Sequence, residues 1–185
     1  DTLAKWYEAR ALSGSSAEDP VIEMALRTAE RCKDLILSTN ITETRFREYP
    51  VEIQHLVETV IPLAGSIGGF GDAATRGAIG HAVHNALSPH PETHAFLHGS
   101  KVGYGLLVQE KLLGHDDDYA ELRDYLLVQE QPTTLADFAL SLDVVETLAL
   151  RTSKEELCRL LRPIVSAEQL VDAITRNETV SVSTT

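Results

Sequence analysis

The sequence predicts an all-α fold. Apolar residues recur at spacings of three and four along most of the chain, which is the period of an amphipathic helix. No segment keeps the alternation of apolar and polar residues that marks a strand. The 185 residues suffice for a sizeable buried core. We assign residues 1–178 to one helical domain and expect a disordered tail over residues 179–185.

The helical period divides the chain into a series of helices. An amphipathic helix is expected at the chain start, and Asp19 and Pro20 are suited to cap and open a long helix that reaches Leu37. Gly114 is expected to end a later helix. Besides these, the period predicts helices over residues 51–63, 73–87, 101–113, 119–128, 135–140, 144–150, 154–161 and 167–176.

Residues 65–71 hold four glycines in seven positions and are predicted to form a loop between two helices. Such a loop favours either tight helix packing or a close approach of the backbone to a ligand. A phosphate-binding loop is disfavoured, because the preceding segment is predicted to be helical and no Gly-Lys-Ser/Thr follows.

The composition argues against several classes of partner. The net charge of −12, from 28 acidic and 16 basic residues, disfavours nucleic acid and an anionic membrane surface. No apolar run approaches the roughly 20 residues that span a bilayer. Cys32 and Cys158 lie within apolar helical patterns, so we expect two buried thiols and a reducing, cytoplasmic location.

Five of the seven histidines fall within 26 consecutive positions. His81 and His84 are three apart and project from one helix face, and His98 follows a loop just before the next helix. Because imidazole is the commonest protein ligand for metals, these side chains form a candidate metal site. Spacing alone also allows histidines that are satisfied by packing or exposed to solvent. His90 and His94 lie in a polar loop, and we expect them to be exposed.

Three segments, in chain order, resemble a known family: residues 1–9, the run His81-Ala82-Val83-His84-Asn85, and residues 98–109. They are similar to the iron-containing alcohol dehydrogenases in the glycerol dehydrogenase branch. Within that branch they resemble most the bacterial hydroxycarboxylate dehydrogenases, which also carry a segment like residues 132–137. The resemblance implies a multi-helix C-terminal domain like that of glycerol dehydrogenase and dehydroquinate synthase.

The resemblance also implies a set of metal ligands. Asp1, His81 and His98 match the one Asp and two His that bind Zn²⁺ or Fe²⁺ in the family. Such a metal acts as a Lewis acid on the substrate, while a nicotinamide accepts the hydride. His84 lies on the same helix face as His81, so we expect it to contact substrate or relay the alcohol proton, with a packing role as the alternative. Lys101 is expected to face solvent.

Two further residues are candidates for substrate binding. Arg76 precedes His81 by five residues and is suited to bind the carboxylate of a hydroxy or keto acid, with an exposed position on a helix surface as the alternative. Phe70 is expected to line the substrate pocket if the glycine-rich segment lies near the cleft.

Members of the family carry an N-terminal α/β domain that binds the nicotinamide dinucleotide. The chain has no strand-helix alternation with a glycine-rich phosphate-binding turn, and it begins at Asp1 rather than at a methionine. We therefore expect a truncated chain from which that domain is absent. NAD or NADP would bind through the missing domain, and the isolated chain is expected to be inactive.

The expected function is that of the catalytic metal-binding domain of an NAD(P)-dependent dehydrogenase. Its substrate would be an alcohol, a glycerol-like polyol or a 2-hydroxycarboxylate, and the protein is expected to form a homo-oligomer. The alternative is a non-catalytic helical oligomerisation module with relic histidines. A lyase similar to dehydroquinate synthase is a third possibility, although its pattern in the metal-binding helix matches residues 81–85 less well.

Overall fold

The computed structural model describes residues 1–13, 19–39, 41–71, 75 and 77–180. These residues are largely helical and contain no strand, which confirms the predicted all-α fold. Among them, no helix is both long and apolar enough to cross a membrane. The chain divides into two compact units, Thr2–Arg76 and Gly77–Thr185, and Asp1 belongs to the second.

The first unit is built around the long helix α2. Asp19 caps this helix, because its Oδ1 accepts hydrogen bonds from the backbone N–H groups of Val21, at 2.8 Å, and Ile22, at 3.4 Å. The cap and the following proline confirm the predicted helix start. The elements of the unit are α1 (Thr2–Ser13), α2 (Pro20–Ser38), α3 (Glu43–Glu48), α4 (Val51–Glu58), the π-helix η2 (Thr59–Leu63) and α5 (Ala64–Gly71).

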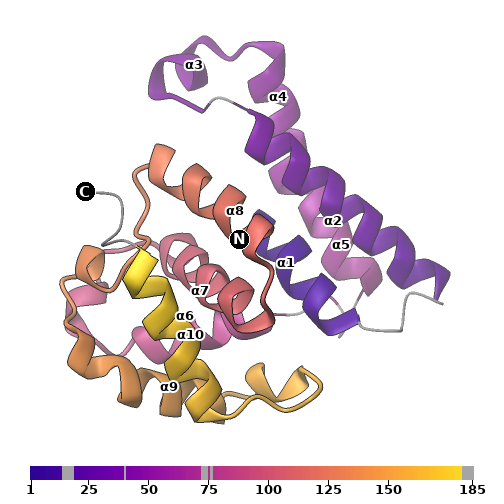
Figure 1. Cartoon of the computed structure of the whole chain (residues 1–185). Coiled ribbons are helices and arrows are strands. Elements are labelled where there is room, and N and C mark those ends of the chain that lie inside the picture. Colours follow the sequence, from indigo (N-terminus) through magenta and orange to yellow (C-terminus); the bar gives the residue numbers. More distant parts are fainter. Residues whose placement is uncertain (14–18, 40, 72–74, 76, 181–185) are drawn as a thin grey trace. The chain divides into compact units, whose positions relative to one another are not determined.

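Helix α2 packs against its neighbours α1 and α5 (Figure 1). Ala25, Ala29 and Cys32 are buried together with Ile67 of α5, and Trp6 of α1 packs against them. Cys32 and Cys158 are both buried free thiols, as the sequence predicts, and burial raises the pKa of each.

The glycine-rich segment is a helix rather than the predicted loop. Residues 65–71 belong to α5, where the side chain of Ile67 is fully buried and its carbonyl oxygen accepts a hydrogen bond from the Thr75 hydroxyl at 3.2 Å. Packing of Ile67 against α2 thus outweighs the low helix propensity of the glycines. The predicted helix over residues 51–63 changes to π geometry at its end, where Pro62 lacks the N–H that a regular turn needs.

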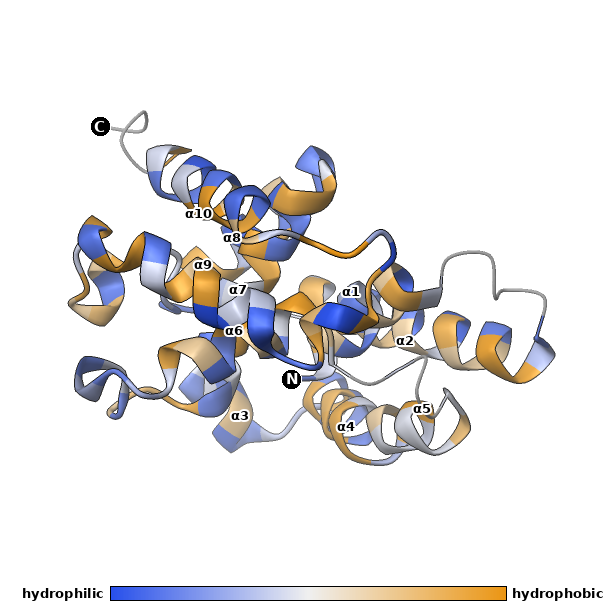
Figure 2. Ribbon diagram, turned by 90° about the horizontal axis from the view of Figure 1, so that it is seen from below, coloured by the Kyte–Doolittle hydropathy of each residue, from blue (hydrophilic) through white to orange (hydrophobic). Residues whose placement is uncertain are grey.

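The second unit surrounds the buried helix α7, which packs against α6, α8 and α10 (Figure 1). Every residue of α7 from Lys101 to Glu110 is buried. Figure 2 shows hydrophobic and hydrophilic residues interleaved along α10, as expected for a helix with one buried face. The elements are α6 (Ile79–Leu87), η4 (Pro91–Thr93), α7 (His98–Leu113), α8 (Asp116–Val128), η5 (Ala136–Phe138), η6 (Leu142–Val144), α9 (Val145–Lys154), η7 (Cys158–Leu160) and α10 (Ala167–Val180).

Several helix ends differ from the prediction. Helix α7 begins at His98, three residues early, and ends before Gly114, whose φ of 74° confirms the predicted helix stop. The helix predicted over residues 154–161 is wrong: Glu155 is extended at the end of α9, and only a short 3₁₀ turn follows. Residues 135–140 also form only a 3₁₀ turn.

The predicted tail and the helix before the histidines need similar corrections. Residues 179 and 180 belong to α10, so the tail does not begin at 179, and residues 181–185 lie outside the described residues. Of the helix predicted over residues 73–87, the α-helix α6 covers Ile79–Leu87. The spacing of apolar residues in the sequence did not predict α3, which has six residues and no buried side chain.

Candidate metal centre

One carboxylate and two imidazoles come together in the second unit. The Asp1 Oδ1 atom lies 2.8 Å from His98 Nδ1 and 3.9 Å from His81 Nε2. One potential ligand atom from each of the three residues lies within 4.8 Å of the others. The side chains are 59%, 47% and 26% exposed for Asp1, His98 and His81, so this cluster opens to solvent. The structure therefore brings together the three predicted ligands.

The close approach of α6 and α7 positions the two histidines. Helix α6 carries His81, and α7 begins at His98. At the crossing, a Cβ on Gly105 would overlap the carbonyl oxygen of Gly80 and lie 2.9 Å from its Cα. Glycine at position 105 thus lets the two backbones approach more closely than any side chain would allow.

Two other glycines border the ligands themselves. A Cβ on Gly77 would lie only 2.8 Å from both Cβ and Cγ of His81 and 2.9 Å from its Nδ1. A Cβ on Gly99 would lie 3.7 Å from the backbone nitrogen of Asp1, which is ordinary van der Waals contact. Of these two glycines, only Gly77 makes room for a predicted metal ligand, the side chain of His81.

The donor set fits a divalent transition metal. One carboxylate oxygen and two imidazole nitrogens are a ligand set that zinc and iron(II) accept, with a position left for water or substrate. Two ligands of a tetrahedral zinc lie roughly 3.3 Å apart. The separations of Asp1 Oδ1 from the two imidazole nitrogens, 2.8 and 3.9 Å, lie on either side of that value. Small side-chain movements would therefore bring Asp1, His81 and His98 to bonding geometry.

His84 lies beside the cluster. Its ring centroid is 4.2 Å from that of His98. Burial lowers the pKa of His84; its hydrogen bond to Asn85 opposes this shift, and the charges of His98, Lys101 and His81 reinforce it. The net effect favours the neutral imidazole, which can accept a proton. Lys101 is 8% exposed, so the expectation that it faces solvent is wrong.

Both residues predicted to bind substrate, Arg76 and Phe70, belong to the first unit, whereas this cluster belongs to the second. Arg76 lies outside the described residues. Phe70 is 53% exposed on α5, in the first unit. His90 Nε2 lies 3.4 Å from Arg151 Nη1, and His94 Nε2 lies 3.1 Å from the carbonyl oxygen of Ser88. The exposed loop position predicted for His94 is confirmed, whereas His90 is half-buried.

A second cluster of potential ligands, which the sequence did not predict, lies where α7 meets α8. It consists of Glu110, His115 and Asp118. The Glu110 side chain is fully buried, and its Oε2 lies 2.9 Å from His115 Nδ1. Residues 115–118 are visible in the sequence as a histidine followed by three acidic residues. Their buried partner could not be inferred, because Glu110 belongs to the preceding helix.

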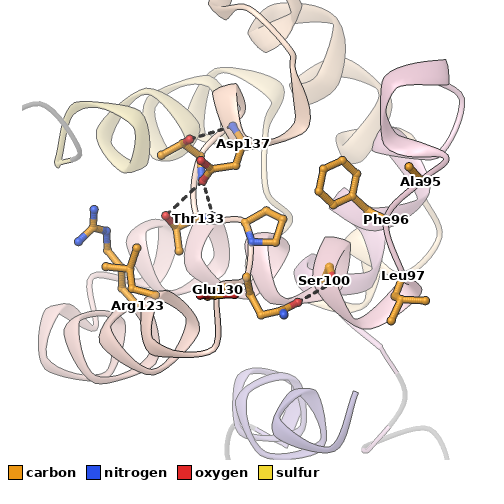
Figure 3. A pocket seen from close by; sticks show the side chains of 12 residues that line it. Ala95, Phe96, Leu97, Ser100, Arg123, Glu130, Thr133 and Asp137 are labelled. Atoms are coloured by element: carbon orange, nitrogen blue, oxygen red, sulfur yellow. Dashed lines mark hydrogen bonds between the residues drawn. The ribbon is translucent and has the colours of Figure 1, made fainter. Parts of the chain in front are cut away.

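A cavity of about 700 Å³ also lies in the second unit (Figure 3). The Asp137 carboxylate fixes its polar wall, because Oδ2 accepts hydrogen bonds from the backbone N–H groups of Thr133 and Thr134, both at 2.9 Å. Another wall includes Leu97 and Ser100, which lie on either side of His98 in the sequence. The cavity is lined by Ala95, Phe96, Leu97, Ser100, Arg123, Leu127, Glu130, Gln131, Pro132, Thr133, Thr134 and Asp137.

Comparison with known proteins shows similarity to dehydrogenases. No protein-family model matches the chain. Hydroxycarboxylate dehydrogenase A of Escherichia coli is 35% identical over 179 residues, which are 95% of this chain and 48% of that protein. A glycerol dehydrogenase of Pseudomonas putida is 33% identical over 78% of this chain and 40% of its own length.

Two solved structures share the fold. A probable glycerol dehydrogenase from Sinorhizobium meliloti aligns with a TM-score of 0.77 and 21% identity, over 100% of this chain and 54% of that one. The glycerol dehydrogenase from Schizosaccharomyces pombe aligns with a TM-score of 0.75 and 21% identity, over 98% and 48% of the respective chains.

The chain spans about half the length of the curated relatives it matches, 48% of the Escherichia coli protein and 40% of the Pseudomonas putida protein. The similarity of these relatives extends over most of this chain. The relatives include a hydroxycarboxylate dehydrogenase and glycerol dehydrogenases. Over most of its length the chain is thus similar to hydroxycarboxylate and glycerol dehydrogenases.

Proposed function

We propose that this chain is the metal-binding catalytic domain of an NAD(P)-dependent dehydrogenase that oxidises an alcohol, a polyol or a 2-hydroxycarboxylate. The observation that carries the proposal is the cluster of Asp1, His81 and His98, in which one carboxylate and two imidazoles lie within 4.8 Å of one another. The names of the relatives, hydroxycarboxylate dehydrogenase and glycerol dehydrogenase, support a small substrate that carries a hydroxyl group.

The residues of the site have two kinds of role in this proposal, metal binding and proton transfer. Asp1, His81 and His98 would hold Zn²⁺ or Fe²⁺, and the Asp1 carboxylate would neutralise part of the metal's charge. When bound, the metal would act as a Lewis acid toward the substrate hydroxyl. His84 would accept the hydroxyl proton on a ring nitrogen, which requires the neutral imidazole that its lowered pKa favours.

The nicotinamide cofactor would bind outside the described residues. A dinucleotide-binding turn follows a strand and opens a helix, and the described part of the chain contains no strand. We propose that a separate nucleotide-binding domain supplies NAD or NADP and faces the metal site. Purified alone, the 185-residue chain should then transfer no hydride to either nucleotide. A homo-oligomer and a cytoplasmic location remain predictions.

Metal content tests the proposal directly. The chain, purified without chelator and dialysed against zinc, should hold close to one zinc per molecule in elemental analysis. The His81→Ala/His98→Ala double variant should hold almost none, because only the Asp1 carboxylate would remain.

The matched control is the His90→Ala/His94→Ala double variant, which also removes two histidines but leaves the three predicted ligands in place. It should retain the zinc of the parent chain. An equal zinc content per molecule in the parent chain and in the His81→Ala/His98→Ala variant would contradict the proposal. A metal-free chain that forms a stable oligomer would favour the non-catalytic helical module instead.

A further inference from the structure

A line of hydrogen bonds runs from α9 to His84. Glu155 ends α9, and its Oε2 accepts a hydrogen bond from Asn85 Nδ2 at 2.9 Å. The Asn85 Oδ1 atom in turn lies 3.0 Å from His84 Nδ1. Glu155 and Asn85 are 70 residues apart in the sequence, and the packing of α6 against α9 brings them together.

The direction of these bonds follows from the chemistry of the groups. An ionised carboxylate only accepts hydrogen bonds, so Asn85 must turn its NH₂ group toward Glu155. The amide oxygen of Asn85 then faces His84 Nδ1, and this oxygen also only accepts. The proton between them must therefore reside on Nδ1 of His84. Glu155 fixes the orientation of an exposed amide that would otherwise be free to turn over.

The other ring nitrogen of His84 has a different neighbour. Ser88 Oγ lies 3.3 Å from Nε2 but donates its proton to the backbone carbonyl oxygen of His84 at the shorter distance of 2.8 Å. The Lys101 ammonium group donates to the same Ser88 oxygen at 3.5 Å. When the ring proton is on Nδ1, Nε2 of the neutral ring carries an acceptor lone pair, and the Ser88 hydroxyl can turn its proton toward either Nε2 or the carbonyl oxygen.

We propose that Asn85 and Glu155 are positioning residues that hold neutral His84 in the Nδ1–H tautomer and so reserve Nε2 as the proton acceptor. The value of this tautomer for catalysis rests on the role proposed above for His84. The tautomer itself depends only on contacts within α6 and between α6 and α9. Neither Asn85 nor Glu155 belongs to the cluster of potential metal ligands.

Nitrogen NMR of the histidine side chains reads the tautomer directly. The ¹⁵N-histidine-labelled chain is studied with chelator at about pH 8, well above the ordinary histidine pKa. A two-bond ¹H–¹⁵N correlation spectrum should show the His84 ring with its proton on Nδ1. The resonance is assigned by its loss in a His84→Gln variant.

Two substitutions and a control complete the test. Asn85→Leu removes the acceptor at Nδ1, so the His84 signals should shift to the Nε2–H pattern or to an average of the two. Glu155→Gln releases the orientation of the Asn85 amide and should shift the signals in the same direction, although less far. Ser88→Ala alters only the Nε2 side and should leave the proton on Nδ1.

Two results would overturn the proposal: Nε2–H in the parent chain, or an unchanged spectrum in Asn85→Leu. Because the measurement needs neither metal, nucleotide nor substrate, it is independent of the proposed dehydrogenase function. Failure to bind zinc would refute that function and leave the tautomer assignment intact. A wrong tautomer would refute the positioning role alone.

Discussion

At the scale of single residues, the candidate metal centre depends on a position that lacks a side chain. The absence of a side chain at Gly77 leaves room for the His81 ring, since a Cβ on residue 77 would lie 2.8 Å from His81 Cγ. The contact is with the first atoms of the histidine side chain rather than with a flexible end. His81 would therefore have to move as a whole to accept a larger residue.

We predict that Gly77→Ala weakens zinc binding by about 10-fold, the lower end of the range seen when a group that supports a metal ligand is altered. The physical reason is displacement of the His81 imidazole from Asp1 and His98. Isothermal titration with zinc measures the effect. Gly69→Ala is the control, because a Cβ at Gly69 meets no atom within 4 Å. Equal affinities for the parent and Gly77→Ala would refute this role of Gly77.

The sequence predicted some of the site's residues and missed others for identifiable reasons. His81, His84 and His98 share a short stretch, so their spacing on helices was enough to group them. Asp1 lies 80 residues before His81, and only the family resemblance connected the two. Glu155 was missed because its contact with α6 comes from packing of the elements, which no local pattern records.

At the scale of elements, the crossing of α6 and α7 holds the two histidine ligands in one place. The close approach is made between backbones, because a Cβ on Gly105 would lie 2.9 Å from Cα and 3.0 Å from the carbonyl carbon of Gly80. A backbone cannot move aside as a side chain can. The spacing of these helices is therefore sensitive to a single methyl group.

Gly105→Ala should lower the free energy of unfolding by about 1–3 kcal/mol, the usual cost of overpacking a core. Gly103→Ala on the same helix is the matched comparison. Its Cβ would lie 3.3 Å from Leu126 Cδ2, the end of a side chain that can rotate away. Urea denaturation measures both variants. A Gly105→Ala chain as stable as Gly103→Ala would show that the crossing has room to spare.

Helices with long apolar periods were predicted from the sequence, and elements that depend on tertiary packing were not. The run from Val21 to Leu37 has a clear period and a capping residue, so α2 was predicted with its start. Helix α5 contradicts local propensity, since four of its eight residues are glycine, and it forms where Ile67 packs against α2. Glu155 ends α9 at the second residue of the segment 154–161, which was predicted to be helical.

At the scale of the whole molecule, a polar network crosses the second unit and ties the 133–137 segment to two helices. The Glu178 carboxylate of α10 accepts hydrogen bonds from the Tyr104 hydroxyl of α7, at 3.1 Å, and from the backbone N–H of Leu135, at 3.0 Å. Asn177 donates to the carbonyl oxygen of Thr133 at 3.0 Å. Hydrogen bonds to Asn177 and Glu178 of α10 thus hold the 133–137 segment in place.

This network makes part of the stability depend on pH. Burial raises the pKa of Glu178, an effect that its hydrogen-bond donors oppose and the charge of Asp137 reinforces. The folded chain therefore binds the Glu178 proton more tightly than the unfolded chain. The resulting stabilisation is fully present below the unfolded-state pKa, for which the reference value is 4.5, and is lost as the pH rises through the folded-state pKa.

We predict that the stability of the parent chain, relative to Glu178→Gln, increases as the pH falls from neutral toward 4.5. Glutamine cannot take up the proton, so the difference isolates Glu178 from other carboxyl groups. Urea denaturation of both chains across this range measures it. A difference in the free energy of unfolding that is independent of pH would contradict the assignment.

Anomalous X-ray diffraction at the zinc edge, from crystals grown with zinc, tests the proposed metal centre most directly. The peak should lie about 2.0–2.2 Å from a carboxylate oxygen of Asp1 and from one imidazole nitrogen each of His81 and His98. A zinc ion bound instead by Glu110, His115 and Asp118, the second cluster of potential ligands, would contradict the proposal. The absence of any peak at Asp1 would do the same.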